Sequence, residues 1–425
     1  MKILDVNPSI RKSIEPAPSF LRDHFYVLTP QCVDADSIDT PRYLVTLDKG
    51  IGDALVVGLS AIDQIIVNDS TASGKIDVLC SPRQSEIFRY DPRVNRIIET
   101  PLTFYPSPER SSWYKLLAPE SKARELLHFL RGRQYEAVFP STIAPALYIR
   151  LHAHLMLPDV LNLANDIFFA GLREDRPLRY IVRRMVNRYF GRDAAESDLP
   201  ESALLYLSEQ EMQKAEAVVK TYKRQANLMG ERCRVLVVAP DSATPVSRPP
   251  TKLLAASLSQ ALARCPALLA CILPSYTDTE AAGRLSQVLW AFEGRVFEMP
   301  AEPGMTLLET AALLDYSDIC LTGDTGIMHL AASEKRIRPL DDTSYTRENA
   351  TSIIALFGGT NPGFYGYRRR SIILGDGRKE QHSFRPGFSK EAYDPKGRDF
   401  FDHISPQEVS EAICRCAAGD RRVPA

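Results

Sequence analysis

The turn Asp324-Thr325-Gly326 joins an apolar run to a helix of small residues, in which His329 lies one turn in. Backbone N–H groups at a helix start lack partners within the helix, and the helix dipole favours an anion there. Gly326 lets a phosphate approach the backbone closely, and Thr325 and His329 project over the same helix end because they lie four residues apart. The turn therefore predicts a diphosphate site, although Asp or Thr before a helix can be only an N-cap and a helical His only a packed polar residue.

A second glycine turn follows the first apolar strand, where Gly50 and Gly52 permit a tight strand-to-helix connection. Asp53 would lie at the N-terminus of the next helix, where it could be a simple cap or a carboxylate that accepts a proton from a substrate hydroxyl. A dinucleotide-binding turn fits poorly. The third glycine of GxGxxG would fall on Leu55, and the ribose-binding acid on Asp69 would lie in a loop.

Composition excludes several classes of protein. The 425 residues carry 52 basic and 53 acidic side chains, a balance that argues against broad nucleic-acid binding. Eight cysteines without a CxxC pair predict buried thiols of a reducing cytoplasm rather than a disulfide or zinc framework. Residues 1–14 do not resemble a signal peptide, and no run of about 18 apolar residues predicts a membrane span. We therefore expect a cytoplasmic protein.

Apolar strands alternate with helical patterns in two series, which predicts an α/β fold with two doubly wound, Rossmann-like parallel-sheet domains. We expect an irregular extension over 1–40, domains over 41–225 and 226–400, and a C-terminal helix and tail over 401–425. Ligands of such sheets bind at the carboxyl ends of the strands. The strands are expected at 43–47, 76–80, 96–99 and 135–139, and then at 235–239, 268–273, 296–299, 319–321 and 353–357.

The two turns and their neighbours resemble the heptosyltransferases of glycosyltransferase family 9. The resemblance covers roughly two-thirds of the chain, and its motifs occur in the same order and with similar spacing. The matching segments are Gly50–Asp53, Gly304–Leu307, Asp324–Ala332, Ile354–Pro362 and Ile404–Val409.

This resemblance implies a GT-B architecture, with an N-terminal acceptor domain and a C-terminal donor domain facing a cleft. It implies a nucleotide-sugar donor, ADP-heptose, and transfer with inversion, without a metal or another cofactor. Asp53 matches the general base, and Met305 matches a residue beside the adenine. The residues that match the diphosphate site are Asp324, Thr325, Gly326 and His329. The family's usual acceptor is the inner core of lipopolysaccharide, which implies a cytoplasmic enzyme at the inner membrane; another glycan, a metabolite or a protein stays open.

The chain departs from the family pattern after the first strand of the second domain. Val246 stands where the family has a phosphate-binding lysine. Arg248 could reach the diphosphate instead or be a solvated loop residue, since the two cations differ in geometry. Ser242 and Thr244 are weaker phosphate-binding candidates. The extra residues 334–352 suggest either a lid or partner loop, or tolerated surface variation.

Two basic segments have no assigned role. Residues 179–192 form a basic amphipathic pattern that could meet anionic lipids or a phosphorylated acceptor, or simply place Arg183, Arg184 and Arg188 on a solvated face. Residues 368–370 are three arginines that either bind acidic groups or form exposed loop charge.

Two other functions also fit the sequence. One is a UDP-sugar epimerase on a GT-B scaffold, which would need no acceptor. The other is a nucleotide-sugar-binding homologue without activity, as Val246 in the lysine position would suggest.

Overall fold

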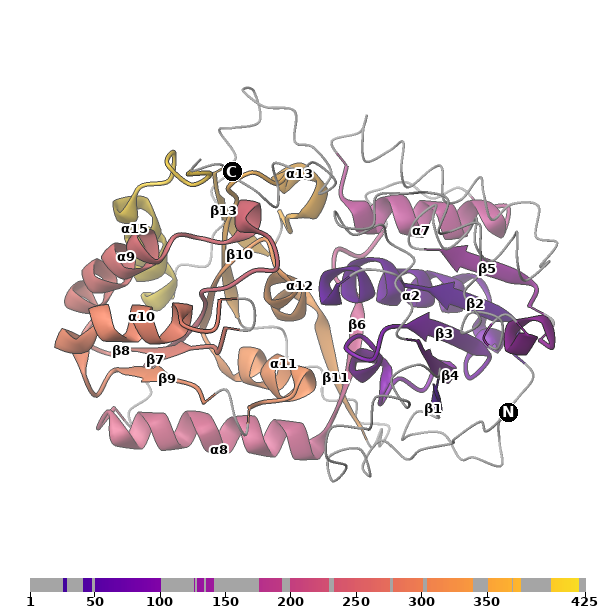
Figure 1. The fold of residues 1–425 in the computed structure, drawn as a ribbon, viewed down its shortest axis with the longest axis horizontal. Helices are drawn as coiled ribbons and strands as arrows, with labels where there is room; N and C mark the ends of the chain where they lie inside the picture. The colour runs from indigo at the N-terminus through magenta and orange to yellow at the C-terminus, as the bar shows by residue number, and fades with distance from the viewer. Residues whose placement is uncertain are drawn as a thin grey trace. The chain divides into compact units, whose positions relative to one another are not determined.

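The chain divides into two compact units, Met1–Tyr206 and Leu207–Ala425. The sequence placed the division between residues 225 and 226. The difference concerns α8 (Glu209–Gln225), which belongs to the second unit. The computed structural model (Figure 1) describes residues 26–28, 41–47, 50–100, 126, 128–133, 135–140, 176–192, 199–228, 233–275, 278–300, 304–338, 351–368, 370–375 and 399–419.

Packing explains why α8 belongs to the second unit. Its Lys214 forms an ion pair with Glu309 at 2.6 Å, and its Tyr222 stacks on Phe297 with ring centroids 4.6 Å apart. A capping box at Ser208 fixes the start of the helix. The strand before it, β6 (Leu204–Ser208), crosses the division between the units.

A five-stranded sheet forms the centre of the first unit, in the order β1-β4-β3-β2-β5. Four strands are parallel and confirm the predicted βαβ pattern, whereas β1 pairs antiparallel with β4. β1 lies within residues 1–40, for which the sequence predicted no regular element. The strands are β1 (Tyr26–Leu28), β2 (Tyr43–Thr46), β3 (Ile76–Cys80), β4 (Val94–Glu99) and β5 (Ala137–Pro140).

One helical run follows β2 and contains a wide turn. It consists of α1 (Ile51–Asp53), the π-helical segment η4 (Ala54–Gly58) and α2 (Leu59–Asn68). The run is long and apolar enough to cross a membrane, with a mean hydropathy of 1.5, but 61% of it is buried within the protein. The helical run is therefore a core helix of the first unit. Short 3₁₀ turns, η5 (Ser70–Ala72) and η6 (Ser85–Phe88), follow.

The basic segment 179–192 forms α7 (Leu178–Tyr189), which runs along α2 (Figure 1). Two of its arginines are buried, so the expected solvated or lipid-facing basic face is wrong for them. Arg183 forms an ion pair with Asp63 of α2 at 2.8 Å, and Arg179 pairs with Glu201 at 2.9 Å. Arg188 is exposed. The buried charges hold α7 against α2 rather than reaching a ligand.

A six-stranded parallel sheet forms the second unit, in the order β13-β12-β10-β7-β8-β9. Its strands confirm the predicted second series and add β13 at the edge. They are β7 (Arg234–Ala239), β8 (Leu268–Ile272), β9 (Val296–Glu298), β10 (Ile319–Gly323), β12 (Ser352–Leu356) and β13 (Ser371–Leu374). One further strand, β11 (Glu334–Arg338), begins the predicted insertion; residues 339–350 lie outside the described residues.

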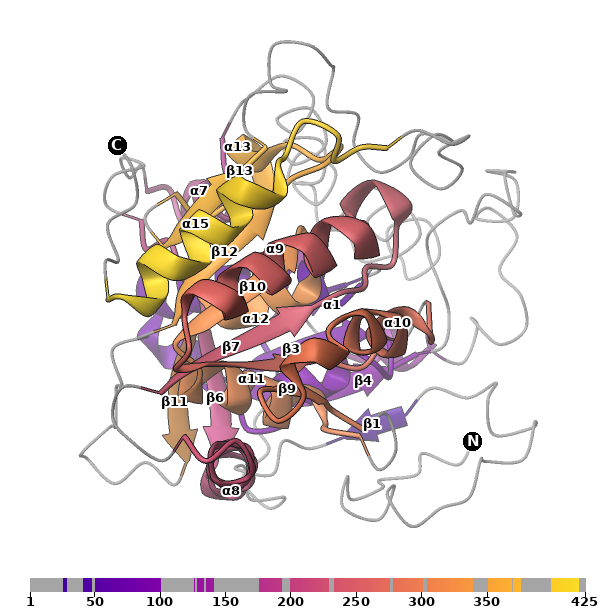
Figure 2. The same cartoon turned by 90° about the vertical axis from the view of Figure 1, so that its left-hand side faces the viewer.

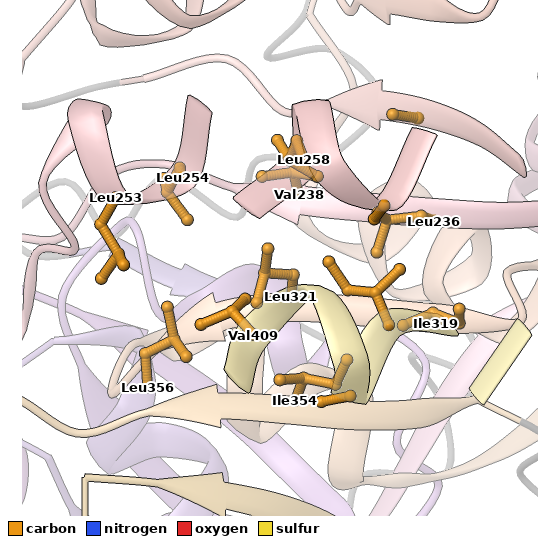
Figure 3. Packing of buried hydrophobic residues seen from close by; sticks show 14 of the residues in the cluster. Leu236, Val238, Leu253, Leu254, Leu258, Ile319, Leu321, Ile354, Leu356 and Val409 are labelled. Carbon is orange, nitrogen blue, oxygen red and sulfur yellow. The ribbon is translucent and has the colours of Figure 1, made fainter. Parts of the chain in front are cut away.

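Helices α9 and α15 lie side by side over one face of this sheet, with α10 next to α9 (Figure 2). Alternate strand residues such as Val238, Leu321 and Leu356 point into their core, where Leu258 and Val409 meet them (Figure 3). The helix predicted within 401–425 is thus part of the second unit, and residues 420–425 lie outside the described residues. The helices are α9 (Thr251–Arg264), α10 (Ala281–Val288), α11 (Leu307–Tyr316), α12 (Gly326–Ala332), α13 (Pro362–Tyr365) and α15 (Pro406–Ala417).

Candidate functional site

The strand order of the second unit has a switch point between β7 and β10. From β7 the chain continues outward through β8 and β9, whereas β10 lies on the other side of β7 and leads to β12 and β13. Ligands of open parallel sheets bind outside the carboxyl ends of the strands at such a point. The loop 240–250 follows β7, and the turn before α12 follows β10. The strand order therefore places both predicted diphosphate-binding segments at the switch point.

The turn after β10 is built by Thr325, the N-cap of α12. Its Oγ1 accepts a hydrogen bond from the Ile327 amide at 3.2 Å and lies 3.0 Å from the Thr322 hydroxyl. Its carbonyl accepts from the Met328 amide at 3.1 Å. Two of the first amides of the helix thus serve the cap itself. The backbone amides that remain as predicted hydrogen-bond donors to an anion are therefore those of Thr325 and Gly326.

His329 lies on the same helix, with 4% of its surface exposed. Its Nδ1 is 2.9 Å from the hydroxyl of Tyr367, and its Nε2 is 3.8 Å from Oδ1 of Asp324. The second distance is too long for a hydrogen bond, so the two groups attract each other strongly only when the imidazole is protonated. The Nε2 side of the ring thus faces the predicted diphosphate turn, while the Nδ1 side faces Tyr367.

Gly323 is required by a close approach of the loop after β7. A Cβ atom at this position would lie 2.2 Å from the carbonyl oxygen of Ser247 and 3.0 Å from Cδ of Pro249. A third loop joins them, because the Gly359 amide donates to the Val246 carbonyl at 3.1 Å. The connections after β7, β10 and β12 therefore meet at one end of the sheet.

The predicted residues of the loop after β7 are arranged around Arg248. Its Nε forms an ion pair with Asp241 at 2.9 Å, and its Nη2 donates to the Ser242 carbonyl at 2.8 Å. Ser242 is buried, and the Thr244 amide approaches its Oγ at 3.5 Å. Val246, in the lysine position of the family pattern, is buried and packs on Gly359. Arg248 is therefore the cation that this loop presents, held by its own neighbours and partly exposed.

Met305 lies farther along the same edge of the sheet. It is half-buried and directly precedes Thr306, the N-cap of α11, in the connection from β9. The sheet order separates β9 from β7 by one strand, β8. Its place beside the adenine stays a prediction, and the described contacts do not join Met305 to the turn at Asp324.

The turn in the first unit is built around Gly50, the N-cap of α1. Its carbonyl accepts from the Asp53 amide at 3.1 Å and from Nε2 of Gln84 at 3.0 Å. Asp53 is half-buried in the first helical turn, as predicted. A Cβ atom on Gly50 would meet no described atom within 4 Å, and its φ of −81° suits any residue. Glycine at 50 is thus not required by packing within this unit; Gly52 lies in α1.

Sequence reasoning missed the groups that hold the other end of α12. Nζ of Lys335 donates to the Ala331 carbonyl at 3.0 Å, and a guanidinium nitrogen of Arg370 donates to the Ala332 carbonyl. The guanidinium of Arg370 is a cation at a helix C-terminus, where it complements the helix dipole. Arg370 is therefore not only exposed loop charge, whereas Arg368 is exposed. Neither Lys335 nor Tyr367 belongs to a recognisable motif, so only coordinates could reveal their contacts.

Comparison with known proteins gives a fold and a match of one segment to a family. Residues 295–393 match the model of glycosyltransferase family 9 (heptosyltransferase), a range that includes Met305, the Asp324–His329 turn and Tyr367. No curated protein sequence matches the chain.

Three solved structures share the fold over most of both chains. ADP-heptose lps heptosyltransferase II of E. coli is 19% identical with a TM-score of 0.56, covering 90% of this chain and 100% of its own. A family 9 glycosyl transferase from Veillonella parvula is 15% identical with a TM-score of 0.59, covering 90% and 98%. The E. coli heptosyltransferase WaaC with ADP is 15% identical with a TM-score of 0.54, covering 88% and 99%. The predicted GT-B architecture is confirmed, and residues 295–393 are similar to glycosyltransferase family 9 (heptosyltransferase).

Proposed function

We propose that this protein is an inverting glycosyltransferase that moves a heptose from ADP-heptose to an acceptor hydroxyl. The observation that carries the proposal is the coincidence of the family match with the switch point. The matched range 295–393 contains the Asp324–His329 turn, which follows β10 at the carboxyl end of the sheet. One of the similar E. coli proteins is an ADP-heptose lps heptosyltransferase and the other, WaaC, was solved with ADP, which supports the same donor here.

In the proposed reaction the second unit holds the donor and stabilises the leaving ADP. Three groups would donate hydrogen bonds to the diphosphate as it gains negative charge: the amides of Thr325 and Gly326 and the Nε2–H of His329. Arg248 adds a fixed positive charge from the neighbouring loop. A carboxylate cannot donate to a phosphate, so Asp324 would act by orienting His329 or by accepting hydrogen bonds from donor hydroxyls.

Asp53 is the proposed general base. It would remove the proton of the acceptor hydroxyl as that oxygen attacks the anomeric carbon from the side opposite the ADP, which gives inversion. Its half-buried place in the first turn of α1, directly after the glycine turn that matches the family pattern, supports this role.

Calorimetric titration with ADP, UDP, GDP and NAD tests the donor class. We expect ADP to bind most tightly, and His329→Ala and Arg248→Met to weaken ADP binding specifically. Selective binding of NAD, or equal binding of all four, would contradict the proposal.

Turnover tests the base. Asp53→Ala should lower kcat at least a hundredfold, since general-base catalysis contributes about 10²–10⁴-fold, while the Kd for ADP stays within about twofold. Asp402→Ala is a suitable control, because its side chain is 61% exposed. Full activity of Asp53→Ala would remove Asp53 from the mechanism.

The acceptor that we propose is the inner core of lipopolysaccharide, with the enzyme in the cytoplasm at the inner membrane. Assays should also include other glycans and protein acceptors. Incubation of a UDP-sugar without acceptor tests for an epimerase, which would yield an isomer.

A non-catalytic nucleotide-sugar binder is the second candidate. One observation favours it, because Val246 is buried where the family pattern has a phosphate-binding lysine. ADP binding without turnover of ADP-heptose on any of these acceptors would support this candidate over the enzyme.

A further inference from the structure

The side chain of Tyr367 contacts the predicted phosphate-binding residue His329 at Nδ1, the ring nitrogen that faces away from the Asp324 turn. Its hydroxyl lies 2.9 Å from Nδ1 of His329, and the two rings meet edge-on with centroids 5.6 Å apart. Both residues are 4% exposed. A contact this well buried excludes bulk water from the Nδ1 side of the imidazole.

The contact with Tyr367 and the nearby carboxylate of Asp324 together favour one position for the proton of His329. A neutral imidazole has one N–H, and a tyrosine hydroxyl can donate or accept. If Tyr367 donates to Nδ1, the proton of His329 sits on Nε2, the nitrogen 3.8 Å from Asp324. In the opposite tautomer the lone pair of Nε2 would face that carboxylate and any bound phosphate, which is repulsive. The arrangement therefore favours Tyr367 as donor and Nε2–H toward the anion.

Tyr367 is itself held firmly. Its carbonyl accepts hydrogen bonds from the Ser371 amide at 2.8 Å, the Ser371 hydroxyl at 2.7 Å and the Arg370 amide at 3.1 Å. Arg370 in turn donates to the Ala332 carbonyl at the end of α12. Tyr367 thus contacts α12 at His329, and Arg370 contacts it again at its C-terminus, so together they fix both the ring and the helix that carries it.

We propose that Tyr367 is a positioning residue, which orients His329 and holds its proton on Nε2 for the donor diphosphate. The inference rests on the proposed function, because it assigns to His329 a contact with that diphosphate. Analogous partners of metal-bound histidines fix the tautomer in the same way.

Tyr367→Phe keeps the ring and removes only the hydroxyl, so it tests the proposal directly. Loss of one neutral hydrogen bond should weaken ADP binding about fivefold, as measured by calorimetry. Tyr222→Phe, on α8, is the matched control and should leave ADP affinity unchanged.

A double-mutant cycle separates positioning from a general structural effect. In a His329→Ala background, Tyr367→Phe should change ADP affinity by less than about twofold, because the residue acts through the imidazole. An equal loss in both backgrounds would overturn the proposal.

A second measurement needs neither ADP nor a tyrosine variant. In protein labelled with ¹⁵N-histidine, the signal of His329, identified by its loss in His329→Gln, should report a neutral ring protonated on Nε2. Protonation on Nδ1 would refute the inference. If the wild-type protein does not bind ADP, the proposed function fails, while this spectrum still decides whether Tyr367 holds the proton of His329 on Nε2.

Discussion

Gly323→Ala is expected to destabilise the second unit and to weaken nucleotide binding together. The added Cβ would lie 2.2 Å from the Ser247 carbonyl oxygen, so this backbone must withdraw by about 1 Å. Overpacking of this kind costs about 1–3 kcal/mol. Because the loop that moves carries Arg248, ADP affinity should also fall.

Gly283→Ala is the matched control for this substitution. Gly283 lies inside α10, and its Cβ would approach only the Glu298 carboxylate, at 3.9 Å. Replacing a helical glycine with alanine should stabilise by about 0.5–1 kcal/mol. Replacing glycine with alanine is thus expected to lower the stability of the second unit at position 323 and to raise it at position 283.

Scanning calorimetry distinguishes the two outcomes. For a unit of this size 1 kcal/mol corresponds to about 2–4 °C, so the unfolding transition of the second unit should fall by about 2–12 °C in Gly323→Ala and rise slightly in Gly283→Ala. The transition of the first unit should not move. An unchanged Tm and unchanged ADP affinity in Gly323→Ala would refute the close approach of the loop.

Three further predictions concern buried or constrained charges. Asp63→Asn should destabilise the first unit by about 3–5 kcal/mol in urea unfolding, because Asp63 pairs with two buried arginines, Arg93 and Arg183; a loss below 1 kcal/mol would contradict this. Burial lowers the pKa of Lys335 to about 7, so between pH 7 and about 10 the unfolded chain binds one proton more than the folded protein. Stability should therefore rise with pH across this window in the wild type and not in Lys335→Met; parallel pH curves would argue against the buried amine. Arg248→Met should weaken ADP binding about tenfold, the worth of a charged hydrogen bond, and an unchanged Kd would leave this arginine without a role at the diphosphate.

The sheet of the second unit could be predicted because its strands are short and apolar and are separated by segments with a helical pattern of apolar residues. Strands such as β7 and β10 are buried on both faces, so they are continuous apolar runs that can be recognised in the sequence. The turn at Thr325 could be predicted for the same reason, since its cap and helix are local features.

Long-range pairing could not be predicted. The arginines of α7 have the spacing of a solvated basic face, and only the partners Asp63 and Glu201, distant in sequence, show that two of them are buried. The roles of Tyr367 and Lys335 likewise follow only from their hydrogen bonds to α12. Such contacts leave no periodic signal in the sequence, because a single polar pair needs only one residue on each element.

The wide turn at Ala54–Gly58 sets the rotation of Asp53 about the helix axis. A π-helical segment amounts to one inserted residue in an α-helix, and each residue advances the direction of its side chain by about 100°. Removing one residue from this segment would restore regular α-helical geometry while α2 kept its buried face. The carboxylate of Asp53 would then swing about a quarter of a turn away from its present direction, with no change in its chemical identity.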